Sequence, residues 1–209
     1  MSEPEKVLLA TRSAGKLREL KGILEEAGLI GVSLADYGIP ESRDEDGIEC
    51  HSTFEENALA KARYFNRLTG MPTLADDSGL RVDALDGAPG VWSKRFSGRS
   101  DLSGQALDDA NNAKLLSELR GQENRLASYA CAAAYANGGE EYVAMGETFG
   151  HIVDQPSGDN GFGYDPYFHS AELEKTFGDA TTAEKQAISH RGRAFRALMS
   201  ALRGHSKGI

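Results

Sequence analysis

The chain has 209 residues and a formal net charge of −9 at pH 7, with a sequence pI near 5.1. This length can bury one sizeable hydrophobic core, and we predict a single domain over residues 1–209. Proteins that bind nucleic acid carry a basic face, so the acidic composition argues against a nucleic-acid partner. No apolar run approaches the roughly 20 residues of a membrane-spanning helix, so no membrane partner is expected.

The two cysteines indicate a cellular compartment. Cys50 and Cys131 have neither the spacing of a metal site nor that of a disulfide framework. Free thiols are typical of a reducing compartment. The first residues also lack the basic and apolar regions of a secretory signal, so we expect a cytoplasmic protein.

The first candidate site is a polar loop between a predicted strand at 6–11 and a predicted helix from about residue 14 to residue 27. Free backbone N–H groups and the helix dipole converge at such a helix start and bind anions. Lys16 adds a cation there. The spacing of a P-loop is absent, so a phosphate site and an ordinary connection both remain open.

An acidic loop follows a second predicted strand at 30–34. Its acidic residues are Glu41, Asp44, Glu45, Asp46 and Glu49. Most of them are expected to be solvated, although loops on a rigid scaffold commonly carry functional residues and one acid could reach a metal.

A helix is predicted to begin after Thr53, because Glu56 occupies the capping-box position. Gly70 ends this helix. Asn57 and Lys61 are four residues apart and therefore share one face. Whether Lys61 faces solvent or a ligand is left open by this pattern.

The central stretch is 73–96, and it begins with the sequence TLADDSGL. We interpret its first three residues as the end of a buried strand, with Asp76 and Asp77 placing two carboxylates where that strand ends. Ser78 and Gly79 are then expected to turn the chain. Adjacent carboxylates suit Mg²⁺, which binds carboxylates, waters and substrate phosphates. A solvated acidic turn is the alternative.

The second half of the chain predicts an amphipathic helix at 102–119 and two long strands at 125–135 and 141–152. A turn at 137–139 joins these strands into a hairpin. Strands that alternate with helices before a long hairpin predict an α/β fold, with a mixed sheet and helices packed against it.

Two further motifs suit a flat ligand. Glycines on both sides of Phe162 allow close approach of the backbone while the ring stacks on the ligand; a tight loop with a buried aromatic ring is equally open. Ser189 is the predicted N-cap of a last helix. Lys185, His190 and Arg191 lie near its start, where they suit an anion or a base edge.

Taken together, these motifs resemble the inosine triphosphate pyrophosphatase family. They extend from residue 6 to about residue 202 and read TRSAGK, TFEENALAKA, ADDSGL with DGAPGVWSKRF, GFGYDP, and EKQAISHRGRA. The resemblance implies hydrolysis of dITP, ITP and XTP to the monophosphate and pyrophosphate with Mg²⁺. It also implies a twisted central sheet, two lobes around a substrate cleft, and a homodimer.

The resemblance also implies roles for individual residues. Asp77 is the implied catalytic carboxylate and a metal ligand, Ser78 a substrate contact and Lys61 a phosphate-neutralising group. The implied triphosphate loop consists of Thr11, Arg12, Ser13, Ala14, Gly15 and Lys16. The implied nucleoside-binding set consists of Phe162, Gly163, Tyr164, Asp165, Lys185, His190 and Arg191.

Two departures from the family pattern affect this assignment. Ser13 stands where the family usually carries Asn. The acidic loop is longer than in the family, so Glu45 is the implied second metal ligand with Asp44 or Asp46 as alternatives. Asp76 is a further candidate for holding the metal or its water shell.

Two alternative functions remain. A nucleotide-binding regulator would not need the acidic pair, so the intact Asp77 argues against it. A pyrophosphatase of related fold that acts on modified pyrimidine nucleotides is disfavoured by the motif at 189–191.

Overall fold

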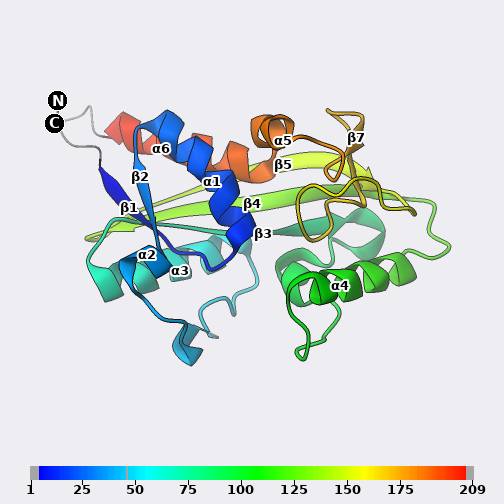
Figure 1. Cartoon of the computed structure of the whole chain (residues 1–209), viewed down its shortest axis with the longest axis horizontal. Coiled ribbons are helices and arrows are strands. Elements are labelled where there is room, and N and C mark those ends of the chain that lie inside the picture. The colour runs from blue at the N-terminus through cyan, green and yellow to red at the C-terminus, as the bar shows by residue number, and fades with distance from the viewer. Residues whose placement is uncertain (1–4, 46, 206–209) are drawn as a thin grey trace. The chain divides into compact units, whose positions relative to one another are not determined.

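The computed structural model describes residues 5–45 and 47–205, so the alternative metal ligand Asp46 lies outside the described residues. The chain forms the predicted α/β fold, with a seven-stranded mixed sheet in the order β2-β1-β3-β4-β5-β6-β7 (Figure 1). β1 pairs in parallel with β2 and β3, and β6 pairs in antiparallel fashion with β5 and β7. The strands are β1 Lys6–Leu9, β2 Ile30–Ser33, β3 Thr73–Val82, β4 Leu126–Asn137, β5 Glu140–Ile152, β6 Phe168–Ser170 and β7 Lys175–Thr176.

The helices connect and flank these strands. The α-helices are α1 Ala14–Ala27, α2 Leu34–Tyr37, α3 Phe54–Thr69, α4 Gly104–Glu118, α5 Thr182–Ile188 and α6 His190–His205. Short 3-10 helices are η1 Arg43–Glu45, η2 Asp83–Leu85 and η3 Gly90–Arg95. Across the described parts of the chain, no helix combines the length and the apolar character needed to cross a membrane.

The chain divides into two compact units made of interleaved segments. Of the described residues, the first unit contains 5–45, 47–77, 131–146 and 191–205. The second unit contains 78–130 and 147–190. The predicted substrate cleft between two lobes stays a prediction.

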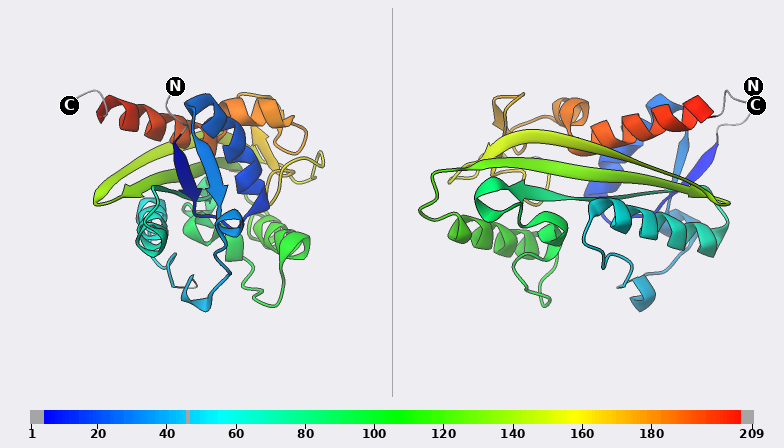
Figure 2. Two further views of the ribbon diagram at one scale, coloured as in Figure 1. Left: turned by 60° about the vertical axis from the view of Figure 1, so that its left-hand side comes forward. Right: turned by 180° about the vertical axis from the view of Figure 1, so that it is seen from behind.

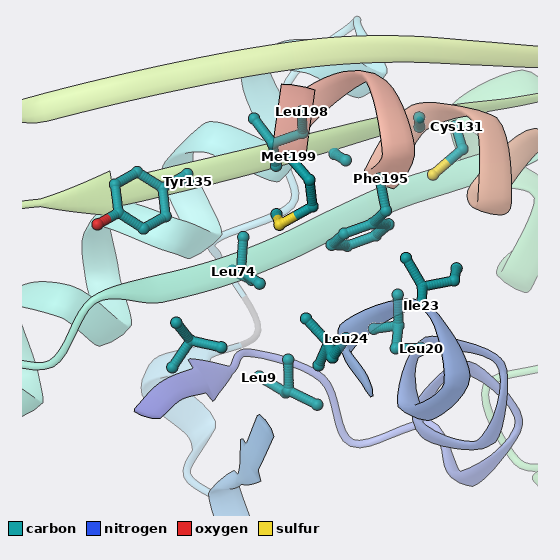
Figure 3. Close-up of a cluster of buried hydrophobic side chains, with 13 residues drawn as sticks. Leu9, Leu20, Ile23, Leu24, Leu74, Cys131, Tyr135, Phe195, Leu198 and Met199 are labelled. Atoms are coloured by element: carbon teal, nitrogen blue, oxygen red, sulfur yellow. The ribbon is translucent and has the colours of Figure 1, made fainter. Parts of the chain in front are cut away.

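In the first unit, α1 and α6 cover one face of the sheet and α3 covers the other (Figure 2). Figure 3 shows the core on the side of α1 and α6, where side chains of both helices meet those of the strands. Because side chains alternate along a strand, Cys131 and Tyr135 of β4 point to this core. Its labelled members are Leu9, Leu20, Ile23, Leu24, Leu74, Cys131, Tyr135, Phe195, Leu198 and Met199.

The core of the second unit is rich in aromatic residues. Tyr129, Phe168 and Phe177 pack against one another with ring centroids 4.7 to 5.9 Å apart. Leu115 of α4 also packs in this core, as does Leu119, the residue directly after α4. These contacts fix the position of α4 within the unit.

One prediction about the central stretch is wrong. The strand does not end at Asp76 and Asp77, and Ser78 with Gly79 does not form a turn, because β3 continues through both to Val82. Leu80 and Val82 are fully buried in the core of the second unit, and their burial stabilises the continuing strand. As successive residues of a strand, Asp76 and Asp77 must point to opposite faces of the sheet.

Most other predicted elements are confirmed. Gly28 and Gly70 end α1 and α3 in the left-handed conformation, and Thr53 accepts a hydrogen bond from the Glu56 N–H at the start of α3. The long hairpin is also present as β4 and β5. Ser189 follows α5 and precedes α6 directly, so it serves as the C-cap of a helix that the sequence analysis did not predict.

Candidate functional site

Asp76 lies at the centre of a buried charge cluster in the first unit. Its Oδ2 atom is 3.0 Å from Lys16 Nζ of α1 and accepts a 3.0 Å hydrogen bond from Arg191 Nε of α6. The Cys131 thiol lies 3.9 Å from the same oxygen, and Arg191 also pairs with Glu19. Asp76 therefore links α1, which follows the predicted phosphate loop, to α6, which begins with residues predicted to contact the base.

The cluster holds Asp76 in its ionised form. Burial disfavours the charged carboxylate, but Lys16 and Arg191 outweigh that cost and keep the pKa of Asp76 far below its usual value. Burial also disfavours the charge on Arg191, and Asp76 with Glu19 raises the pKa of this guanidinium. Asp76 Oδ1 is buried and has no hydrogen-bond partner among residues 5–45 and 47–205. These contacts indicate that Asp76 positions the side chains of Lys16 and Arg191.

Asp77 points to the opposite face of the sheet, toward α3. Its Oδ2 atom accepts a 2.9 Å hydrogen bond from Asn57 Nδ2. The Asn57 side chain is itself held, because its Oδ1 atom accepts a 2.9 Å hydrogen bond from the His51 N–H. Asp77 is only 7% exposed, and burial together with the charge of Glu49 raises its pKa. The carboxylate is thus oriented, and its raised pKa means a higher affinity for a proton.

Glu49 and Lys61 accompany Asp77. Lys61, on the same face of α3 as Asn57, forms an ion pair with Glu49. Burial opposes the charge on both groups, but their mutual attraction lowers the pKa of Glu49 and raises that of Lys61. Glu49 is therefore an acid whose charge acts on Asp77.

Glu45, the acid that the resemblance implied as a metal ligand, forms an ion pair with Arg12, and its role as a ligand stays a prediction. Its carboxylate accepts two hydrogen bonds from Arg12, of 2.6 and 3.2 Å. The same guanidinium donates to the carbonyl oxygens of Ile39 and Pro40 at 2.8 Å. Arg12 and Glu45 therefore fasten the acidic loop to the segment before α1. Asp44, the other described alternative, is exposed.

The start of α1 has the features of an anion site. Ser13 is the N-cap, and its hydroxyl accepts a 3.4 Å hydrogen bond from the Lys16 N–H. Thr11 in turn accepts a 3.2 Å hydrogen bond from the Ser13 N–H. The first N–H groups of a helix lack intrahelical partners and can bind an anion. Ser13 thus takes the capping position that suits Ser and Asn alike.

The predicted nucleoside-binding loop lies in the second unit and is tightly constrained. Asp165 Oδ2 accepts hydrogen bonds from the Phe162 N–H at 2.8 Å and from Lys185 Nζ at 2.6 Å. A Cβ atom on Gly161 would lie 2.1 Å from that same oxygen, so only glycine fits there. Lys185 also lies 4.9 Å from the centre of the Phe162 ring. These contacts therefore hold the loop, Lys185 and the Phe162 ring together.

His190 is placed by an aromatic platform in the second unit. Its ring is 4% exposed and stacks on Tyr129, with centroids 4.7 Å apart and planes inclined by 9°. The Tyr129 ring is in turn nearly parallel to the Phe177 ring, with centroids 5.9 Å apart. The predicted contact of His190 with a base stays a prediction, and so does that of Arg191, whose side chain is held in the ion pairs described above.

The structure thus brings together two sets of predicted site residues, one in each unit. The first set contains Lys16, Lys61 and Asp77, since the charges of both lysines act on Asp77. The second contains Phe162, Asp165, Lys185 and His190. Ser78 follows Asp77 in β3 and is half-buried.

Sequence analysis missed the particular roles of two residues near Asp77. Glu49 was one acid of five in a loop without periodicity, and no spacing signal distinguished it from Glu45. Asn57 was recognisable as a neighbour of Lys61 on α3, but its partner Asp77 is 20 residues away.

The fold and the charge cluster define a mixed α/β protein whose lysines, carboxylates and helix start are groups that phosphoryl-transfer enzymes use. The profile of the Ham1 family matches residues 7–201, and the chain belongs to this family. It is 47% identical over 196 residues to the dITP/XTP pyrophosphatase of Geobacter sulfurreducens, covering 92% of this chain and 94% of that protein. It is 44% identical over 201 residues to the protein of the same name from Ralstonia nicotianae, covering 95% and 96%.

Solved structures agree with the family assignment. The Ham1 protein of Staphylococcus aureus superimposes with a TM-score of 0.81 and 34% identity, covering 96% of this chain and 100% of that one. A protein of Mycobacterium abscessus described as a nucleoside-triphosphatase and dITP/XTP pyrophosphatase has a TM-score of 0.67 and 43% identity, covering 94% and 98%.

Proposed function

We propose that this chain hydrolyses non-standard purine nucleoside triphosphates, namely dITP, ITP and XTP, to the monophosphate and pyrophosphate. The observation that carries this proposal is the buried Asp77 carboxylate, oriented by Asn57 and accompanied by Glu49 and Lys61. The dITP/XTP pyrophosphatase names of relatives that match more than nine-tenths of the chain support the choice of substrate.

Charge explains how an acidic protein binds this substrate. A triphosphate carries about four negative charges, and the protein has a net charge of −9, so local cations must neutralise the phosphates. Lys16 and Lys61 supply two positive charges, and the N-terminus of α1 supplies backbone N–H groups. Asp76 holds Lys16 at the start of α1, ready to contact phosphate.

Mg²⁺ is the proposed cofactor, and the residues present fit it. Mg²⁺ is usually held by one or two carboxylates plus waters and substrate phosphates. Asp77 and Glu49 supply two carboxylates close enough for the charge of Glu49 to raise the pKa of Asp77. A bound cation held by these carboxylates would relieve that repulsion. When bound, Mg²⁺ would neutralise phosphate charge and stabilise the pyrophosphate leaving group.

The catalytic contribution of the chain is mostly positioning. Asn57 fixes one oxygen of Asp77, and the carboxylate is proposed to orient a water and accept its proton as that water attacks the α-phosphorus. Lys16 and Lys61 stabilise the negative charge of the phosphates in the same step. The bond that breaks joins the α-phosphorus to the oxygen that leaves with pyrophosphate.

Glu49→Gln should weaken the binding of Mg²⁺ by the enzyme more than Glu45→Gln does. The first change removes a carboxylate near Asp77, whereas the second removes a partner of Arg12. We expect the Mg²⁺ concentration at half-maximal rate to rise at least about tenfold in Glu49→Gln. Titration of the dITP hydrolysis rate with Mg²⁺ measures this, and equal shifts in the two variants would refute the assignment of Glu49.

Lys16→Ala should weaken binding of ITP at least about tenfold while changing binding of inosine little, because Lys16 is assigned to the phosphates. Calorimetric titration without Mg²⁺ measures both affinities before any turnover. Lys21→Ala is the matched control, since Lys21 is an exposed lysine of the same helix. An equal loss for ITP and inosine would contradict the assignment.

The proposed function is tested by pyrophosphate release from a panel of triphosphates, with and without Mg²⁺. We expect kcat/KM for dITP, ITP and XTP to exceed that for dATP, dGTP and dCTP by at least about a hundredfold. Preference for a modified pyrimidine triphosphate would indicate the rival pyrophosphatase activity. Binding without turnover would indicate a regulator.

We also propose that the chain works in the cytoplasm as a homodimer. Cys50 and Cys131 form no disulfide among the described residues, which supports a reducing compartment. The dimer rests on the family resemblance, and analytical ultracentrifugation of the purified protein tests it.

A further inference from the structure

Gly163 is held on both sides of its backbone by two side chains of α4. Its N–H donates a 3.0 Å hydrogen bond to Asp108 Oδ2, and its carbonyl oxygen accepts a 3.0 Å hydrogen bond from Asn112 Nδ2. Asp108 and Asn112 are four residues apart, so they lie on the same face of the helix. One residue of the loop is therefore clamped between two successive turns of α4.

This clamp belongs to the interior of the second unit. Asn112 is 6% exposed, and its Oδ1 atom has no hydrogen-bond partner within the described residues, so the Gly163 carbonyl is the contact that orients the amide. Asp108 is half-buried. α4 is itself anchored by Leu115, which is fully buried in the aromatic core. The clamp thus connects the loop to a rigid element.

Further contacts restrict the conformation of the loop on both sides of Gly163. Gly163 adopts a left-handed φ of +64°, which a residue with a side chain rarely adopts. The N–H of Phe162 is bound by Asp165 on one side of Gly163, and the Tyr164 hydroxyl donates a 2.7 Å hydrogen bond to the Ser93 carbonyl on the other. Asp108 and Asn112 hold the middle of this segment.

We propose that Asp108 and Asn112 are specificity-determining positioning residues, which fix the Gly163 backbone and with it the Phe162 ring in the geometry that selects the purine base. The proposal rests on the proposed function and on the assignment of this loop to the nucleoside. A polar site discriminates between bases only while its groups hold their positions, because a mobile loop can adapt to the wrong base. Neither residue contacts the reacting phosphates in this account.

The test compares Asp108→Ala and Asn112→Ala with the wild type. For each we measure kcat/KM for dITP and dATP, together with the Ki of tripolyphosphate as a competitive inhibitor. We expect KM for dITP to rise and the dITP:dATP ratio of kcat/KM to fall about tenfold, which corresponds to one lost hydrogen bond. The Ki of tripolyphosphate, which has no base, should stay within twofold of the wild type.

Two matched variants separate positioning from general damage. Asp108→Asn keeps an oxygen that can accept from the Gly163 N–H, so it should retain most of the selectivity. Asp109→Ala removes an exposed carboxylate of the same helix that bonds Gln105, and it should behave as the wild type. Circular dichroism and thermal denaturation establish that each variant is folded, and Asn112→Ala carries the test if Asp108→Ala does not fold.

The outcomes are distinct. An unchanged dITP:dATP ratio in a folded Asn112→Ala or Asp108→Ala protein overturns the inference and leaves the proposed function intact. Equal losses for dITP, dATP and tripolyphosphate also overturn it, because they indicate general damage. A wild-type protein that does not hydrolyse dITP overturns the proposed function, and the inference falls with it.

Discussion

Asp77→Asn is expected to fold and to bind substrate, but to lower kcat for dITP at least about a hundredfold, the usual scale for loss of a general base. The amide keeps the size of the carboxylate and can still accept the hydrogen bond from Asn57. It cannot take a proton from water, and it is a poorer Mg²⁺ ligand than a carboxylate. Steady-state kinetics at saturating Mg²⁺ measures the loss.

Two controls accompany the Asp77→Asn experiment. Asp83→Asn removes an exposed carboxylate from η2, shortly after Asp77 in the chain, and should leave kcat unchanged. Binding of ITP in the absence of Mg²⁺ should stay close to the wild-type value. Near-normal turnover in a folded Asp77→Asn protein would remove this residue from the mechanism.

Arg191→Ala is expected to lower the free energy of unfolding by about 3–5 kcal/mol, the usual cost of removing one partner of a buried ion pair. Arg191 is 2% exposed, and its guanidinium pairs with Asp76 and Glu19. Without it, the buried Asp76 carboxylate keeps Lys16 but loses its second cation, while a cavity remains where the side chain was. Urea denaturation followed by circular dichroism measures the change.

The control for Arg191→Ala is Arg203→Ala on the same helix. Arg203 is exposed and donates one hydrogen bond to the Ala27 carbonyl, so its loss should cost less than about 1 kcal/mol. A destabilisation below about 1 kcal/mol in Arg191→Ala would contradict the structural role assigned to this residue. If the variant stays folded, its dITP:dATP ratio of kcat/KM tests the predicted contact with the base.

Much of the fold was predictable because local patterns and tertiary packing agree. Apolar periodicity, Thr53 at a helix start and glycines at helix ends predicted α1 and α3, and the glycine turn predicted the hairpin of β4 and β5. The helix α5 was missed because it has only seven residues and its capping box at Thr181 was not recognised.

The error at β3 has a physical cause. Two aspartates followed by Ser and Gly are typical of a turn, but here Asp76 is neutralised by Lys16 and Arg191, a residue 115 positions away. A long-range ion pair of this kind leaves no local signal in the sequence. Burial of the following residues then favours a continuous strand over a turn.

The candidate site was predictable where a residue type carries its own chemistry. The positions of Lys16 at a helix start and of Lys61 on the face of Asn57 were predicted from sequence. The roles of these lysines and of Asp77 stay predictions. The contacts of Glu45 and Glu49 were not predictable, because the pair of Arg12 and Glu45 joins residues 33 positions apart. Which of the two acids binds a metal stays a prediction.

The central claim is cleavage between the α- and β-phosphates, and phosphorus NMR of the products from dITP and Mg²⁺ in ¹⁸O-water tests it directly. We predict dIMP and pyrophosphate in equal amounts, with the ¹⁸O label in the monophosphate because water attacks the α-phosphorus. Formation of dIDP and inorganic phosphate would contradict the account, and so would ¹⁸O in pyrophosphate.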